Sequence, residues 1–299
     1  MPVLDSRIGL YTSSFVGSVA ALGHLITPFG HVPPVSGTTV LERQLMGTMP
    51  QFMAMNFMMM ASTLAITARN GSLDAKATAC LMNGVGCIGT SISCLRGFYT
   101  WVPEGVWGGI LLIYGGLYVG IAILNFLGAN YPPAMKMAPL GKPLYWGILY
   151  MVPLYLFYIS MMLFAPHELV TIYYGVEISA YPRRILECMF SFSVAPIFLT
   201  LILLWVGQII TSCSFSTYVI NRFTCVILFA LFVANAVMKM VLQSQNDDGA
   251  LDKMIPGQNI DMVAWLVGFA LFYVPIDLLN VEVKVGVEKA VDVPYGLLK

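Results

Sequence analysis

The sequence predicts an all-α integral membrane protein with about eight transmembrane helices in two related halves. Hydrophobic residues make up 58% of the 299-residue chain and charged residues only 10%, and the mean hydropathy is +0.80. A typical soluble domain carries about 25% charged residues. The apolar residues are gathered in long stretches, and one eight-residue motif occurs twice.

Each predicted helix corresponds to an apolar stretch of roughly 20 residues, the length needed to cross a hydrocarbon core about 30 Å thick. Loops at that depth would leave backbone hydrogen-bonding groups without partners, so helices are expected. An even number of helices places both termini on one side. Basic residues are slightly more frequent in the loops of that side, which favours a cytosolic, matrix or stromal location for the termini. The predicted helices lie near residues 12–32, 44–67, 74–98, 105–127, 145–165, 185–210, 217–242 and 260–280.

Duplication is indicated by the octet Tyr118–Asn125, YVGIAILN, which returns as Tyr273–Asn280, YVPIDLLN. Five of the eight positions are identical, and each octet closes an apolar stretch that has a Trp near its start. Paired prolines, which cannot continue a helix, separate the halves. Four helices in each half give both repeats the same topology. We therefore expect a first repeat at 1–129, a Pro-rich linker at 130–143, a second repeat at 144–280 and a C-terminal tail at 281–299.

In each half the last residues of the first predicted helix lead into or include a proline, Pro28 or Pro166. An expected loop follows, and then a basic residue at the start of the next helix, Arg43 or Arg184. Together with the number of helices, the Leu163–Pro166 motif and these two arginines resemble the DoxX-like group of small four-helix membrane proteins, here in tandem. The resemblance implies a fold but no catalytic residue, because members of that group differ in function.

Two predicted helices carry sulfur-containing residues at regular spacing. Cys80, Cys87 and Cys94 are seven residues apart and share one helix face, in a stretch rich in Gly and Ser. Metal binding would need ligands from another helix, and there is no CxxC loop, so close helix packing is the favoured interpretation.

The preceding helix has Met pairs one turn apart, which could bind copper(I) or fill gaps in an apolar interior. Packing is again favoured, and no metal site is predicted.

His24 is the one histidine that lies well inside an apolar stretch, and it is the candidate cofactor-binding residue. A single imidazole there could ligate haem iron or chlorophyll magnesium, or could donate a hydrogen bond to a neighbouring helix. Haem between helices would normally need a second axial ligand at the same depth, but His31 and His167 lie at predicted helix ends. We therefore expect a structural role for His24 and no cofactor other than structural lipids.

Polar side chains within the apolar stretches are the other candidate contacts, since burying them in lipid is costly. Arg183 and Glu187 are four residues apart and are expected to pair on one helix face. Asp277 has no charged counterpart in the first octet, which has Ala122 at that position. The candidate ligand or interhelical contacts are Asn56, Asn83, Asn235 and Asp277.

The tail 281–299 departs from helical periodicity, because its first residues, VEVKVGVE, alternate between apolar and polar side chains. This alternation predicts a strand, and a single strand in a helical chain could pair with a sheet of a partner subunit. An irregular tail is the alternative.

The sequence has no phosphate-binding loop, zinc-protease motif, nucleophile elbow or paired acidic motif, so no catalytic residue is predicted. Fifteen basic residues balance fifteen acidic ones, which argues against nucleic-acid binding. We expect a non-catalytic accessory subunit of a larger membrane complex, in contact with lipids and partner subunits, in the mitochondrial inner membrane or another organellar membrane. The alternative is a binding protein, transporter or enzyme for a small lipophilic molecule such as a quinone, sterol or lipid.

Overall fold

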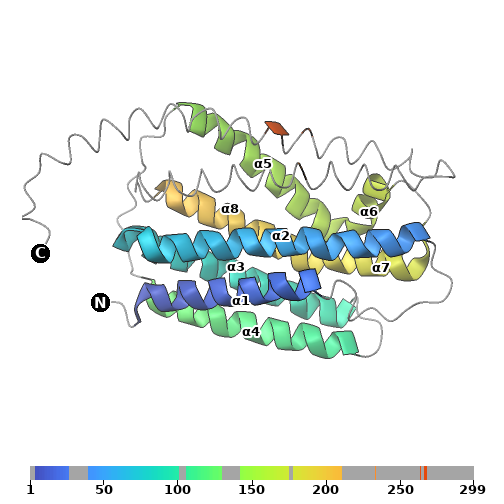
Figure 1. Cartoon of the computed structure of the whole chain (residues 1–299), viewed down its shortest axis with the longest axis horizontal. Coiled ribbons are helices and arrows are strands. Elements are labelled where there is room, and N and C mark those ends of the chain that lie inside the picture. The colour runs from blue at the N-terminus through green and yellow to red at the C-terminus, as the bar shows by residue number, and fades with distance from the viewer. Residues whose placement is uncertain are drawn as a thin grey trace, which may run out of the picture.

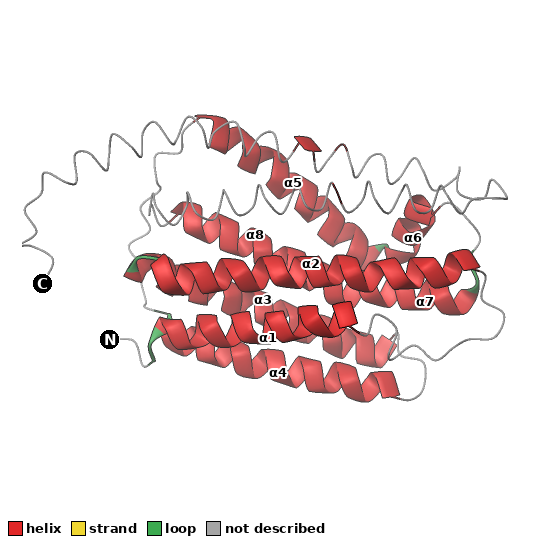
Figure 2. Cartoon of the chain, in the orientation of Figure 1, coloured by secondary structure: helices red, strands yellow, loops and turns green. Residues whose placement is uncertain are grey.

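The computed structural model describes residues 4–26, 40–100, 106–129, 142–174 and 178–210, together with the single residues Val233, Val263, Leu266 and Val267. Nearly all of these residues are helical and no strand occurs among them, as Figure 2 shows. The all-α prediction is therefore confirmed for the described part of the chain. The helices predicted at 217–242 and 260–280, apart from those single residues, and the tail 281–299 lie outside it.

Four long helices run lengthwise through the molecule and alternate in direction (Figure 1). They are α1 (Ser6–Ile26), α2 (Val40–Asn70), α3 (Leu73–Thr100) and α4 (Val106–Gly128). α1 lies beside α2 and α4, and α3 lies beside α4. They correspond to the first four predicted helices, but α1 begins six residues earlier than expected. The reason is a local cap, because the backbone N–H of Arg7 donates to Asp5 Oδ1 at 2.9 Å.

The remaining elements are α5 (Lys142–Phe164), α6 (Pro166–Tyr174), α7 (Ala180–Cys188), the π-helix η1 (Met189–Val194) and α8 (Ala195–Ile210). α7, η1 and α8 follow one another without a break and cover the helix predicted at 185–210.

The loop expected after the fifth helix is wrong, because α6 begins at Pro166. Proline is well tolerated at the first position of a helix, where its missing N–H needs no partner. The chain bends by 114° between α5 and α6. α7 also begins earlier than expected, so Arg184 lies inside that helix and not at its first residue.

Four helices in the described ranges are long and apolar enough to cross a membrane. They contain the spans Ser6–Leu25, Leu73–Phe98, Leu111–Gly128 and Pro182–Leu204, and the bent pair α5 and α6 makes a fifth if it is counted as one span. α2 is outside this set because polar residues, among them the buried Asn56, interrupt its apolar sequence. Helices able to cross a membrane are therefore present in this part of the chain, while eight spans in two repeats stay a prediction.

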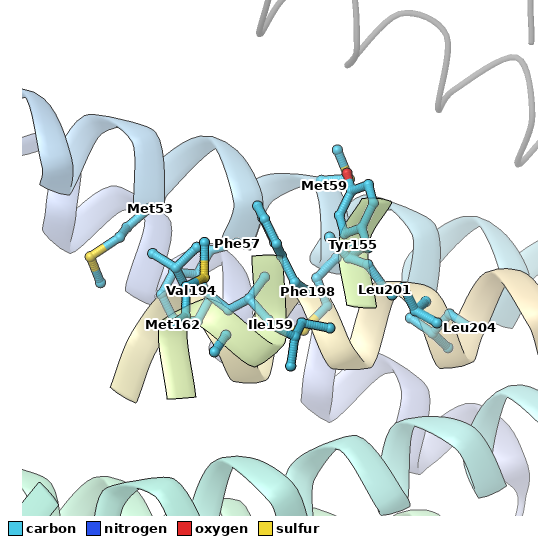
Figure 3. Packing of buried hydrophobic residues seen from close by; sticks show 14 of the residues in the cluster. Met53, Phe57, Met59, Tyr155, Ile159, Met162, Val194, Phe198, Leu201 and Leu204 are labelled. Atoms are coloured by element: carbon cyan, nitrogen blue, oxygen red, sulfur yellow. The ribbon is translucent and has the colours of Figure 1, made fainter. Parts of the chain in front are cut away.

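The largest hydrophobic core lies where α2, α5, η1 and α8 meet (Figure 3). Tyr155 of α5 and Phe198 of α8 are buried at this junction, with ring centroids 4.7 Å apart. Met53 and Met59 of α2 are buried in the same cluster. Methionine is flexible enough to fill irregular gaps between helices, which is the role favoured for the Met-rich helix.

α3 approaches two neighbours closely because its interior residues are small. A Cβ atom added at Gly86 would lie 3.1 Å from the Cα of Thr200 in α8. One added at Gly84 would lie 2.8 Å from the ring of Phe126 in α4. A side chain at either position would push the helices apart, so these glycines set the spacing of α3 from α4 and α8.

Candidate functional site

A network of buried polar side chains joins α1, α3 and α4. The amide of Asn83 in α3 donates to Ser13 Oγ at 2.8 Å, and the amide of Asn125 in α4 donates to the same oxygen at 2.9 Å. Ser13 Oγ donates in turn to the Gly9 carbonyl oxygen at 2.8 Å. One hydroxyl therefore uses its proton and both lone pairs, and the three side chains are buried.

Asn83 is one of the predicted contacts, whereas its partners Ser13 and Asn125 are not. Asn125 carried a signal that could have identified it, because both copies of the repeated octet end in asparagine and the first copy lies inside an apolar stretch. Its Nδ2 also donates to the Ile121 carbonyl oxygen at 2.9 Å, and its Oδ1 has no hydrogen-bond partner in the described ranges. The network fixes the relative positions of three helices.

His24 lies near the end of α1 and is half-buried. Its imidazole stacks on the ring of Phe57 in α2, with centroids 5.7 Å apart and planes 16° apart. The predicted contact residue Asn56 is fully buried in α2. No group of three His, Cys, Asp or Glu side chains within the described residues is placed to hold a metal ion. The structure thus places His24 in a contact between α1 and α2.

Asn235 and Asp277, the other two predicted contact residues, lie outside the described residues. The same holds for the second octet and for the tail 281–299. What the sequence suggests for them stays a prediction.

The regularly spaced cysteines of α3 lie against α1 and α4. Cys80 Sγ donates to the Ser6 carbonyl oxygen at 3.2 Å. Cys87 is buried in a cluster with Tyr118 and Ile121 of α4. Cys94 is buried as well. The three thiols therefore take part in the packing of α3 against its neighbours.

Ionisable side chains gather where α5 bends into α6. His167 Nδ1 lies 3.0 Å from Glu187 Oε1, and Arg183 Nη1 lies 3.2 Å from His167 Nε2. A guanidinium group can only donate, so Nε2 accepts and Nδ1 carries the proton that is donated to Glu187. The direct pair expected between Arg183 and Glu187 is wrong, because the imidazole lies between them.

This contact ties the start of α6 to α7. Glu187 is 5% exposed and needs a hydrogen-bond donor at that depth. His167 provides one because the 114° bend returns the chain toward α7. The two residues are 20 positions apart, and no helical periodicity relates them. Sequence patterns therefore gave no signal for this pair.

The π-helix η1 begins two residues after Glu187 and ends just before Pro196 in α8. Proline removes one helical N–H donor and crowds the preceding turn, and a wider π turn accommodates this disruption. Ser191 Oγ in η1 donates to the Met162 carbonyl oxygen of α5 at 2.7 Å. Single π turns inside α-helices are frequent at functional sites.

A pocket of about 210 Å³ lies beside η1, between α3, α5 and α8. Its walls are mostly apolar, with two serine residues and one arginine among them. The lining residues are Gly89, Ile92, Ser93, Arg96, Leu163, Ser191, Phe192, Ala195, Pro196 and Leu199.

α4 presents an apolar face with glycines away from the other helices. A Cβ atom added at Gly109, Gly116 or Gly120 would meet nothing within 4 Å. Ile113 and Ile123 are 71% and 53% exposed. The spacing of three and four residues between these positions places them on one side of the helix. Within the 18-residue apolar window of each span, 33% of the residues are buried in Leu111–Gly128 and 82% in Pro182–Leu204, so α4 is peripheral.

Comparison of the chain with protein-family models, with curated proteins and with solved structures finds no match. The likeness to DoxX-like proteins therefore stays a prediction from the sequence.

Proposed function

We propose that the chain is a non-catalytic subunit of a larger membrane protein complex, in which the outer face of α4 packs against a partner helix. The observation that carries the proposal is the exposed face formed by Gly109, Ile113, Gly116, Gly120 and Ile123. In a bilayer, small residues four positions apart let two helix backbones approach closely, and van der Waals packing then drives association.

A face in contact with lipid alone would not need glycine. Each glycine inside a helix costs about 1 kcal/mol relative to alanine, and lipid tails adapt to a methyl group as readily as to a hydrogen atom. Glycine inside this chain serves close approach, since Gly86 lies against Thr200. The glycines on the outer face of α4 favour a partner that approaches in the same way.

The buried polar groups support the same role. Ser13, Asn83 and Asn125 are engaged with one another across three helices, and His24 is engaged with Phe57. Interhelical hydrogen bonds in membranes contribute about 0.6 kcal/mol each. These groups stabilise the arrangement of the helices that present the outer face of α4.

The proposal includes an eight-helix architecture made of two DoxX-like repeats. It also includes a second contact with a partner through the tail 281–299, and a location in the mitochondrial inner membrane or another organellar membrane. The alternating pattern of the tail and the repeated octet support these parts. Energy-transducing membranes are the preferred setting because their complexes contain many accessory subunits.

Native electrophoresis after extraction in mild detergent tests the proposal. The wild-type chain is expected to migrate with a large assembly. The double variant Gly116→Leu/Gly120→Leu is expected to migrate as a monomer, because the new side chains occupy the space reserved for the partner. The matched control is Gly23→Leu in α1, where an added Cβ also meets nothing within 4 Å but no second open glycine lies one turn away. This control should migrate like the wild type.

Two results would overturn the proposal. Retention of the double variant in the assembly would show that the outer face of α4 is not the contact. Migration of the wild type as a monomer with a stoichiometric lipophilic molecule would instead support the alternative function, binding of that molecule.

A further inference from the structure

The pocket beside η1 is formed by elements that are distant in the sequence. α3 contributes Ser93 and Arg96, α5 contributes Leu163, and η1 and α8 contribute the opposite wall. Its shape depends on the π turn, because Ser191 is held to the Met162 carbonyl oxygen of α5 at 2.7 Å. The cavity is thus fixed by contacts between three helical segments.

The chemistry of the pocket is that of an amphiphile site. Leu163, Phe192 and Leu199 supply apolar walls, and Arg96 supplies a permanent positive charge. Arg96 is exposed and lies two residues before the end of the Leu73–Phe98 span. A long basic side chain at the end of a span reaches the boundary between acyl chains and headgroups. The apolar walls and the charge therefore match the two parts of a lipid.

The volume of about 210 Å³ is below the 300–1,000 Å³ typical of sites that enclose a whole small molecule. A single acyl chain needs only a narrow slot and leaves its headgroup outside. The size of the pocket favours such a chain over a sterol or a quinone ring system with its tail.

We propose that this pocket holds an acyl chain of an anionic phospholipid, whose phosphate contacts the guanidinium group of Arg96. The net negative charge of the headgroup complements Arg96, whereas a zwitterionic headgroup carries its own cation. The site lies within one chain, so it does not depend on the partner contact of α4.

Photolabelling of the full chain in phosphatidylcholine nanodiscs tests the proposal. One sample contains a phosphatidylglycerol with a diazirine in its acyl chain, and the other contains the corresponding phosphatidylcholine probe. Mass spectrometry then identifies the labelled peptides. We expect phosphatidylglycerol to label residues 89–96 and 191–199 about fivefold more than phosphatidylcholine does, the factor that one basic residue contributes near anionic lipid.

Three variants separate the ionic contact from the pocket. Arg96→Gln is expected to lower phosphatidylglycerol labelling about fivefold and to leave phosphatidylcholine labelling unchanged. Arg69→Gln, which removes an exposed charge in the last turn of α2, is expected to change neither. Ser93→Leu fills the pocket and is expected to abolish labelling by both probes while the protein still elutes like the wild type.

Equal labelling by the two probes, or no effect of Arg96→Gln, would overturn the ionic contact. Labelling that persists in a folded Ser93→Leu variant would overturn the assignment to the pocket. Competition by a free fatty acid but not by unlabelled phosphatidylglycerol would overturn the phospholipid as the occupant.

Discussion

Replacing Gly86 with alanine tests the close contact between α3 and α8. The new Cβ would lie 2.9 Å from the Cβ of Thr200 and 3.1 Å from its Cα, so the two helices would have to move apart. Overpacking of this kind costs about 1–3 kcal/mol. Alanine has a higher helix propensity than glycine, and this stabilises the folded chain by about 1 kcal/mol. The net destabilisation expected for Gly86→Ala is therefore about 0–2 kcal/mol.

Gly116→Ala is the matched control, because it gains the same helix propensity but meets no atom within 4 Å. It is expected to stabilise the isolated chain by about 1 kcal/mol. The free energies of unfolding are measured for the dissociated chain in mixed micelles, by titration with a denaturing detergent and circular dichroism. The difference between the two variants, about 1–3 kcal/mol, isolates the contact with Thr200. Equal stability of the two variants would refute it.

Three further predictions concern the polar contacts. Ser13→Ala removes three hydrogen bonds and should destabilise the chain by about 2 kcal/mol in the same titration, and an unchanged midpoint would contradict the network. The N–H of Arg7 donates to Asp5 and holds the pKa of the Asp5 carboxyl below its ordinary value of 3.8. Asp5 therefore contributes stability above that value and loses it as the pH falls through the lowered folded-state value. The protection of the first-turn amides of α1, measured as the ratio of intrinsic to observed exchange rate, should fall in strong acid in the wild type but not in Asp5→Asn. His167→Leu removes the donor to the buried carboxylate of Glu187. Hydrogen exchange in α6 should therefore speed up at constant pH, and unchanged exchange would contradict this contact.

The long helices were predictable because their signal is local. The helix predicted at 105–127 is observed as Val106–Gly128, since apolar length and flanking polar residues determine its ends. α6 was not predictable in this way. It has nine residues, too few to cross a bilayer, and its initial proline indicates a loop as readily as a helix start.

The candidate site was predictable only in part, because its contacts depend on the arrangement of the helices. Asn83 could be identified as a buried amide, but serine is common in membrane helices, so nothing distinguished Ser13 before α1 and α3 were placed together. The contact between His167 and Glu187 depends on the bend between α5 and α6. The pocket likewise requires α3 and the π-helix to meet, which no local pattern specifies.

The contact between Gly9 and Asn125 offers a structural test of the duplication. A Cβ added at Gly9 would lie 3.1 Å from the Cα of Asn125, the last residue of the first octet. Gly9 precedes the proline of its half by 19 residues, and Gly147 precedes the proline of the second half by the same 19. If the halves share one fold, Gly147 lies against Asn280, the last residue of the second octet.

Disulfide cross-linking tests both contacts, Gly9 with Asn125 and Gly147 with Asn280. The cysteine pairs are introduced into a chain from which the six native cysteines have been removed. Gly9→Cys with Asn125→Cys should form a disulfide on mild oxidation, because a Cβ at Gly9 lies 3.1 and 3.2 Å from the Asn125 atoms on either side of its Cβ. That places the two Cβ atoms near the separation of about 3.5–4.5 Å found in disulfides. Gly147→Cys with Asn280→Cys should form one equally well. Cross-linking of the first pair alone would show that the octets occupy different positions. Since disulfide formation depends on backbone geometry, the result is independent of how far Pro275 and Asp277 have diverged from Gly120 and Ala122.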